Sequence, residues 1–181
     1  MAINVITMKS RDIAIVGILL AIGAIIRYVS LLIPGPIVSN LVIAFYSLAI
    51  ILVTPTFREA LGIGIVAGMI CAVVSHSIFP PANLISEPLG ALACLAVHRV
   101  LKGHFILAPA VTTFLATIVS GLSFVLIALI AVAPMILGNF GTANAFFVVT
   151  VPIVIITATI NAGVVQVLEV PALRALARGH Q

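Results

Sequence analysis

Residues 13–33 read IAIVGILLAIGAIIRYVSLLI, an apolar run interrupted by one charge, at Arg27. A helix needs roughly 20 apolar residues to cross the hydrocarbon core of a bilayer, so this run is long enough to span it. The run is continuous rather than alternating, which favours a helix over a strand of a membrane β-barrel. It is also too long for a signal peptide, and no small-residue cleavage site follows it.

The rest of the chain has the same character, with 64% hydrophobic and 7% charged residues over 181 positions. A soluble domain is closer to half apolar and a quarter charged. We therefore predict one all-α membrane domain over residues 1–181, with six transmembrane helices and loops such as Gly138-Asn139-Phe140-Gly141. The expected spans are Ile13–Ile33, Ile37–Val53, Ala60–Phe79, Leu84–Val97, Phe105–Val132 and Ala145–Leu168.

The positive charges predict the orientation of this domain. With six spans, one side of the membrane collects all the lysines and arginines except Arg27. Basic residues gather on the cytoplasmic side of membrane proteins, so both termini are expected in the cytoplasm. The cations on that side are Lys9, Arg11, Arg58, Arg99, Lys102, Arg174 and Arg178.

Two charges remain on the outer half, Arg27 in the first span and Glu87 at the start of the fourth. Charges at membrane depth are costly and mark functional sites. Arg27 and Glu87 could form a structural ion pair. Alternatively, Arg27 binds the carboxylate and Glu87 the ammonium of a zwitterionic substrate.

Other polar side chains are expected at the same level of the membrane. A few convergent polar groups in an apolar cavity are typical of a small-molecule site. Each could instead cap a helix end or, for the deeper Asn161, join two helices. The candidates for substrate binding are Arg27, Asn40, Tyr46, Asn83, Glu87 and Asn161.

Small residues line one face of two spans. Gly17 and Ala21, with Ala24 nearby, form such a face in the first span, and Gly64 and Gly68 form another in the third. Small residues allow a second helix to approach closely. For Gly64 and Gly68 we expect packing inside the bundle, whereas for the first span docking of a partner protein is an equal alternative.

Motifs of catalysis and energy coupling are missing from the sequence. It contains no GxGxxG, P-loop, HExxH or GxSG, and no nucleophile with a base at a plausible spacing. We therefore predict neither catalytic nor metal-binding residues, and a chain that is not an enzyme. The cations are scattered at span ends and form no patch for nucleic acid.

Three segments carry a resemblance to a known family. They are Ala14-x-x-Gly17-x-x-x-Ala21-x-x-Ala24, the junction Phe79-Pro80-Pro81-Ala82-Asn83-Leu84-Ile85-Ser86-Glu87, and Val151-Pro152 followed by Ala158-Thr159-Ile160-Asn161. The chain resembles the substrate-binding S components of energy-coupling factor (ECF) transporters, and most closely those of tryptophan uptake. These carry Phe-Pro-Gly-Gly before Asn-x-x-Asp, where this chain has Pro81-Ala82 and Glu87.

The resemblance implies a function and partners. S components sit in the prokaryotic plasma membrane and capture a micronutrient from outside with high affinity, here tryptophan or a vitamin. They dock through the first span, here Gly17, Ala21 and Ala24, onto a transmembrane coupling subunit that contacts two cytosolic ATPases. ATP is then used by these partners, and no cofactor belongs to this chain. The alternative is a self-sufficient oligomeric carrier or facilitator.

Overall fold

The fold is all-helical in the computed structural model, which describes residues 8–31, 40–75 and 77–178. No strand occurs in these three ranges. The elements are α1 (Ser10–Leu31), α2 (Val42–Val53), α3 (Phe57–Val73), the 3-10 turn η1 (Pro80–Ala82), α4 (Asn83–Leu101), α5 (Ala108–Ala131), α6 (Ala133–Phe140) and α7 (Ala143–Arg178).

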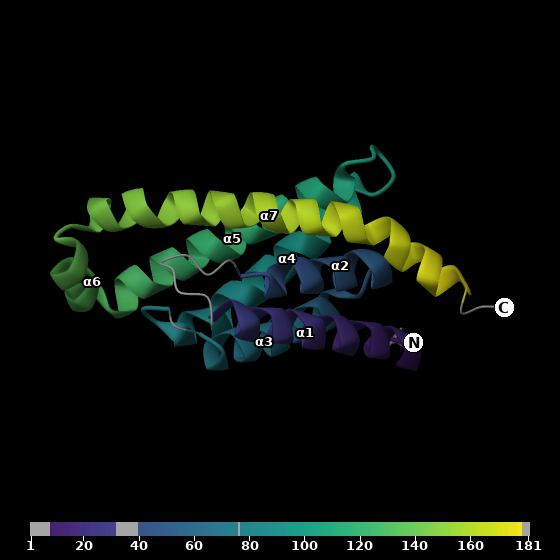
Figure 1. Cartoon of the computed structure of the whole chain (residues 1–181), viewed down its shortest axis with the longest axis horizontal. Coiled ribbons are helices and arrows are strands. Elements are labelled where there is room, and N and C mark those ends of the chain that lie inside the picture. The colour runs from purple at the N-terminus through teal and green to yellow at the C-terminus, as the bar shows by residue number, and fades with distance from the viewer. Residues whose placement is uncertain (1–7, 32–39, 76, 179–181) are drawn as a thin grey trace, which may run out of the picture.

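The chain runs back and forth along one long axis (Figure 1). The start of α1 and the end of α7 lie at the same end of the bundle, while α6 caps the opposite end. We call these the terminal end and the α6 end. An arrangement with both termini at one end agrees with an even number of passes. That the terminal end faces the cytoplasm stays a prediction.

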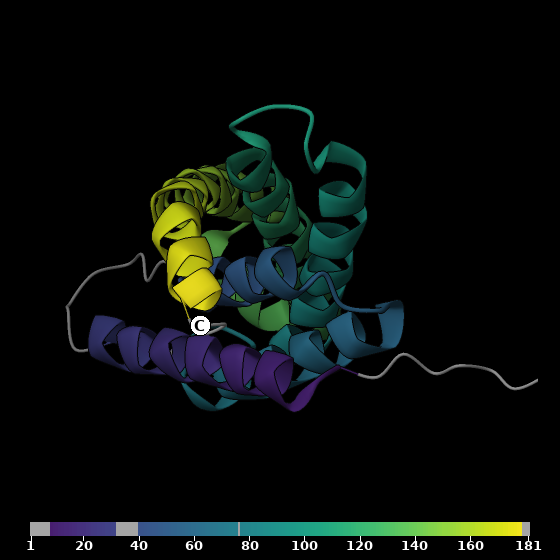
Figure 2. The same ribbon diagram turned by 90° about the vertical axis from the view of Figure 1, so that its right-hand side faces the viewer.

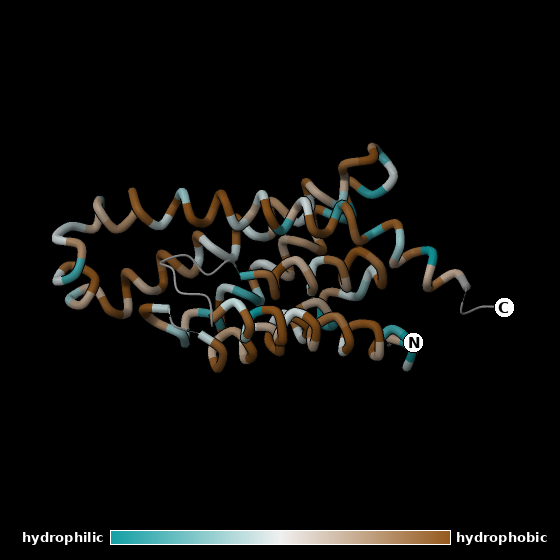
Figure 3. Tube along the Cα trace, in the orientation of Figure 1, coloured by the Kyte–Doolittle hydropathy of each residue, from teal (hydrophilic) through white to brown (hydrophobic). Residues whose placement is uncertain are grey.

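The outside of the bundle is apolar over its length. Hydrophobic residues run along the long helices, and hydrophilic ones collect near the start of α1, in the α4–α5 connection and towards the end of α7 (Figure 3). Large side chains such as Val73, Ile130 and Val167 are largely exposed. Such a surface is stable only in lipid, as expected for a multi-pass membrane protein.

Four helical segments are long and apolar enough to cross a membrane: Ser10–Leu31, Pro80–Leu101, Ala108–Ala131 and Ala143–Ala177. Helix α2 has 12 residues and α3 has 17. At 1.5 Å per residue they cover about 18 and 26 Å, less than the roughly 30 Å of hydrocarbon. The count of six spans therefore stays a prediction, and the first residues of the second expected span lie outside the described ranges.

Helix α2 is the centre of the fold. Every residue from Val42 to Ile51 is buried, and α2 contacts α1, α3, α4, α5 and α7. A helix that is apolar on all sides is one surrounded by other helices. Polar side chains on α2 are therefore held away from lipid.

Several of the expected boundaries are wrong. The predicted loop at residues 138–141 mostly belongs to α6, because Pro134 occupies its first turn and Gly141 ends it with φ 74°. The third span was predicted to reach Phe79, but α3 ends at Val73. There the Ser75 hydroxyl accepts the Ser77 N–H (3.0 Å), a local bond that competes with helix continuation.

Helix α7 extends beyond the predicted Ala145–Leu168. It has 36 residues and contains Pro152 and Pro171. Its length is about 54 Å, so part of it must project beyond the hydrocarbon. In Figure 1 its last turns (yellow) bend towards the end of α2.

Candidate functional site

A buried carboxylate lies near the start of α4. Glu87 is 1% exposed and is the fifth residue of a helix that continues from η1. Asn83 fixes this start, because its side-chain amide donates a hydrogen bond to the Pro80 carbonyl oxygen (2.8 Å). The junction at Pro80 therefore directs Glu87 inward, where lipid does not reach it.

Three neutral groups surround the Glu87 carboxylate. Its Oε1 accepts a hydrogen bond from the Asn40 amide (2.6 Å), and its Oε2 accepts from the Tyr46 hydroxyl (3.2 Å) and the Ser120 hydroxyl (3.0 Å). Asn40 precedes α2, Tyr46 lies in α2 and Ser120 in α5. We call Asn40, Tyr46, Glu87, Ser120 and Asn161 the Glu87 cluster.

Asn161 joins this cluster from α7. Its amide nitrogen donates to the Asn40 carbonyl oxygen (3.1 Å) and to the Thr117 hydroxyl (3.3 Å). Its own carbonyl oxygen Oδ1 is buried and has no hydrogen-bond partner in the described structure. Asn161 therefore acts as a link between helices and also leaves one acceptor unused inside the bundle.

A glycine makes room for the cluster. Gly90 lies one turn after Glu87, and a Cβ atom at this position would meet the Tyr46 hydroxyl and come within 2.8 Å of the Ser120 Cβ. Both donors can therefore reach Glu87 only because residue 90 has no side chain. Asn40 is the one member of the cluster that is only partly buried.

Two of the predicted binding residues lie outside the cluster. Asn83 is the first residue of α4 and bonds to the Pro80 carbonyl oxygen, as described above. Arg27 is 6% exposed and donates its Nε–H to the Val74 carbonyl oxygen (2.6 Å) at the end of α3. Among the described residues, no hydrogen bond or ion pair joins Arg27 to Glu87.

The sequence analysis missed two hydroxyls of the site, Ser120 and Thr117. Thr117 lies four residues after Thr113, and Ser120 lies three residues after Thr117. All three side chains therefore lie on one face of α5. Thr117 donates to the Thr113 carbonyl oxygen (2.8 Å) and accepts from Asn161. This spacing of hydroxyl residues was a readable signal for a polar face inside the bundle.

The predicted docking residues of α1 lie on its outer side. Helix α1 buries Val16, Leu20, Gly23 and Arg27, a stripe that packs mainly on α2. Gly17 and Ala21 are exposed and Ala24 is partly buried, about 100° around the helix from that stripe. Figure 2 shows α1 lying along the outside of the bundle. A Cβ atom at Gly17 would have nothing within 4 Å.

The terminal end is basic and tied together by cation-to-backbone bonds. The Arg99 guanidinium donates to the Pro55 carbonyl oxygen (2.9 Å), and the Arg11 guanidinium to the Leu176 carbonyl oxygen (2.6 Å). The Lys102 ammonium donates to the Thr54 hydroxyl (3.2 Å). The structure therefore places at the terminal end three of the cations that were predicted to be cytoplasmic, Arg11, Arg99 and Lys102.

Comparison with known proteins identifies the family. A family model described as "Tryptophan transporter TrpP" matches residues 9–174, which is most of the chain. No curated protein and no solved structure matches it. The match agrees with the resemblance to tryptophan-uptake proteins, and it makes the chain a membrane protein of amino-acid uptake rather than an enzyme. The chain belongs to the tryptophan transporter TrpP family.

Proposed function

We propose that this chain is the substrate-capture (S) subunit of an ECF-type importer and binds tryptophan from outside through the Glu87 cluster. The observation that carries the proposal is the environment of Glu87. Its carboxylate is 1% exposed and accepts three hydrogen bonds from neutral donors, with no cation at ion-pair distance among the described residues. A buried carboxylate that no cation contacts is costly, and a substrate ammonium would supply that contact.

The remaining polar groups, on Asn161 and Arg27, match the indole nitrogen and the carboxylate of tryptophan. The unused Asn161 Oδ1 is an acceptor for an N–H donor, such as an indole nitrogen. Arg27 is the cation proposed for the substrate carboxylate, and its Nε–H is already held by Val74. In this arrangement Asn40 and Tyr46 position the Glu87 carboxylate and then contact the ligand, while Asn83 fixes the helix start.

Energy for uptake would come from partners. The chain carries no P-loop or other nucleotide motif, so it has no ATPase of its own. The open small-residue face at Gly17 and Ala21 is the proposed contact with a transmembrane coupling subunit. That subunit would connect the chain to two cytosolic ATPases, which use the ATP, in the plasma membrane of a prokaryote.

Binding can be measured with the ligand as its own probe, because the protein contains no tryptophan. Indole emission excited beyond the absorption of tyrosine then comes from the ligand alone, and its blue shift on leaving water reports the bound fraction. Glu87→Gln should weaken tryptophan binding by about tenfold or more, since hydrogen bonds to charged groups contribute about 1.5–3 kcal/mol. Asp12→Asn, a carboxylate change at the start of α1, is the matched control and should bind normally. Unchanged affinity in Glu87→Gln would refute the site.

Transport measurements test the proposal that uptake requires the partner subunits and ATP. Proteoliposomes with the chain alone should bind tryptophan without accumulating it, and uptake should appear only when the coupling subunit, both ATPases and ATP are added. Steady flux through the lone chain would instead establish the self-sufficient carrier, the alternative left open by the sequence.

A further inference from the structure

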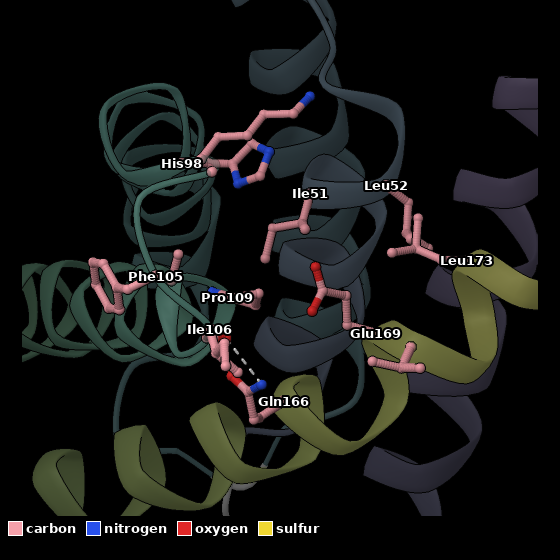
Figure 4. A pocket seen from close by; sticks show the side chains of 13 residues that line it. Ile51, Leu52, His98, Phe105, Ile106, Pro109, Gln166, Glu169 and Leu173 are labelled. Carbon is pink, nitrogen blue, oxygen red and sulfur yellow. Dashed lines mark hydrogen bonds between the residues drawn. The ribbon is translucent and has the colours of Figure 1, made fainter.

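A cavity lies towards the terminal end, and none of its lining residues belongs to the Glu87 cluster. It has a volume of about 360 Å³, within the range of small-molecule sites. Its walls come from the end of α2, the end of α4, the start of α5 and the last third of α7 (Figure 4). Neither the family match nor the proposed tryptophan site gives this cavity a role.

Three polar side chains in this cavity have atoms without partners. His98 is 5% exposed, and both of its ring nitrogens are buried without a hydrogen bond in the described structure. Gln166 donates its amide to the Ile106 carbonyl oxygen (3.2 Å), but its Oε1 is buried and unused. Figure 4 shows the Glu169 carboxylate pointing into the same space, with no hydrogen bond among the described residues.

The unpartnered groups are mostly hydrogen-bond acceptors. They comprise the two oxygens of Glu169, the amide oxygen of Gln166 and one nitrogen of a neutral His98. The matching ligand group is a donor with a positive charge, that is, a primary ammonium with three N–H bonds. The acceptors of Gln166 and His98 are buried, and buried acceptors left without donors are costly, so such a ligand would stabilise the protein by binding.

The rest of the lining is apolar. Ile51 and Pro109 are deep in the cavity, while Phe105 and Leu173 are about half exposed and lie at its rim. A ligand must therefore carry an apolar body beside its ammonium. Lys102 also lies at the rim, where it bonds to Thr54, and could meet a carboxylate on the same ligand.

We propose that this cavity is a second binding site, for a small amphipathic molecule with a primary ammonium, held by Glu169, Gln166 and His98. Two sources fit this chemistry. One is an amphipathic amine without an acid group, and the other is a transported amino acid present on the inner side. The inference does not rest on the proposed tryptophan site, because it uses different residues.

The test uses three indole probes, tryptamine, tryptophan and indole-3-propionate, on the full-length Glu87→Gln variant in lipid nanodiscs, because this change weakens binding at the Glu87 cluster. Tryptamine should bind this variant with a blue-shifted indole emission, and adding Glu169→Gln should weaken its binding about tenfold or more. Adding Gln166→Leu should weaken it less. Asp12→Asn, a carboxylate change at the same end of the bundle, is the control for net charge and should leave it unchanged.

The two sources separate through Lys102. If the ligand is an amino acid, tryptophan binds at least as tightly as tryptamine, and Lys102→Met weakens tryptophan alone. If it is a simple amine, tryptamine binds tighter and Lys102→Met leaves its affinity equal or stronger. Binding of indole-3-propionate in preference to tryptamine, or tryptamine binding that is insensitive to Glu169→Gln, would overturn the proposal. Loss of tryptamine binding in the Glu87→Gln variant itself would assign all binding to the other site.

Discussion

Helices α1 and α3 carry nearly the same small-residue pattern and use it in opposite ways. Helix α4 packs directly against Gly64 and Gly68 of α3. A Cβ atom on Gly64 would lie 2.6 Å from the Pro88 Cα, and one on Gly68 would lie 2.6 Å from the Asn83 carbonyl oxygen. Gly17 of α1 has no atom within 4 Å of such a Cβ, and Ala21 is exposed.

The small-residue faces of α1 and α3 differ in what they pack against. The α3 face brings α4 close enough to fix Asn83 and Glu87, so it supports the proposed substrate site. The α1 face contributes nothing to the folded chain that the structure describes. Because small residues leave only a shallow apolar surface in lipid, an unfilled face of this kind is suited to contact with another helix.

The largest expected effect on stability comes from a substitution on the face of α3 that packs against α4. Gly68→Leu would drive a side chain into the backbone at the start of α4, which cannot move without displacing Glu87. We expect a loss of stability of about 3 kcal/mol or more, and little folded protein after extraction. The measurement is the fraction of monodisperse protein in size-exclusion chromatography and its melting temperature.

Gly62→Leu is the matched control for Gly68→Leu on the same helix. A Cβ atom at Gly62 has nothing within 4 Å, so this change should leave the fold intact. Equal stability of the two variants would show that α3 and α4 do not pack as described.

A smaller effect is expected at Gly90. The Cβ of Gly90→Ala would meet the Tyr46 hydroxyl, which is fully buried and has no free space to move into. We expect about 1–3 kcal/mol lower stability, with tryptophan affinity weakened because the Tyr46–Glu87 bond is broken. The readouts are thermal unfolding and indole fluorescence.

The double variant Gly90→Ala/Tyr46→Phe separates the two consequences of that change. Removing the hydroxyl relieves the overlap with Tyr46 but not the one with Ser120, so stability should recover in part while the weakened binding persists. If the double variant also binds normally, Tyr46 has no part in holding the carboxylate.

Within α1 itself, Gly23 provides the internal contrast to Gly17. A Cβ atom on Gly23 would lie 3.2 Å from the Phe45 Cβ and 3.3 Å from the Val42 Cα of α2. Gly23→Leu should therefore lower stability by about 1–2 kcal/mol, less than Gly68→Leu, because α1 lies at the edge of the bundle and can shift. A melting temperature equal to that of the unsubstituted chain would mean that α1 is not seated on α2.

Much of this molecule can be read from its sequence, for physical reasons that differ from place to place. Continuous apolar runs predict helices, since backbone groups in lipid must be paired within the segment. A polar side chain inside such a run must find a partner, which is why Asn40, Tyr46, Glu87 and Asn161 could be expected to converge. The cations lie at the ends of the predicted helices, so their collection on one side of the membrane can also be predicted from the sequence.

Other features depend on packing that the sequence does not encode locally. Ser and Thr can bond to their own helix backbone, as Thr117 does, so Ser120 gave no sign that it faces Glu87. Arg27 could be predicted to need a partner, but not that the partner is the Val74 carbonyl oxygen. The spacing of small residues also does not predict whether the face of α1 or that of α3 packs against another helix, because this depends on where the neighbouring helix lies.

The smallest effect on the chain, and the most informative for its function, is expected at Gly17. Gly17→Leu places a side chain where nothing lies, and leucine favours a helix over glycine by up to about 1 kcal/mol, so stability should be equal or slightly higher. Tryptophan binding should also be unchanged, since a side chain at Gly17 meets no atom of the chain and lies ten residues before Arg27, the α1 residue proposed to bind the substrate carboxylate. Uptake with the coupling subunit and ATPases should nevertheless be lost, because the added bulk prevents close approach of a partner helix.

Ala21→Leu should behave in the same way as Gly17→Leu, and Gly62→Leu, an equally open position on α3, should transport normally. This pair of results would locate docking on α1 rather than on open glycines in general. Normal uptake by Gly17→Leu would remove α1 from the proposed interface. Loss of binding together with uptake would mean that Gly17 is packed in the membrane, so that the two small-residue faces do not differ after all.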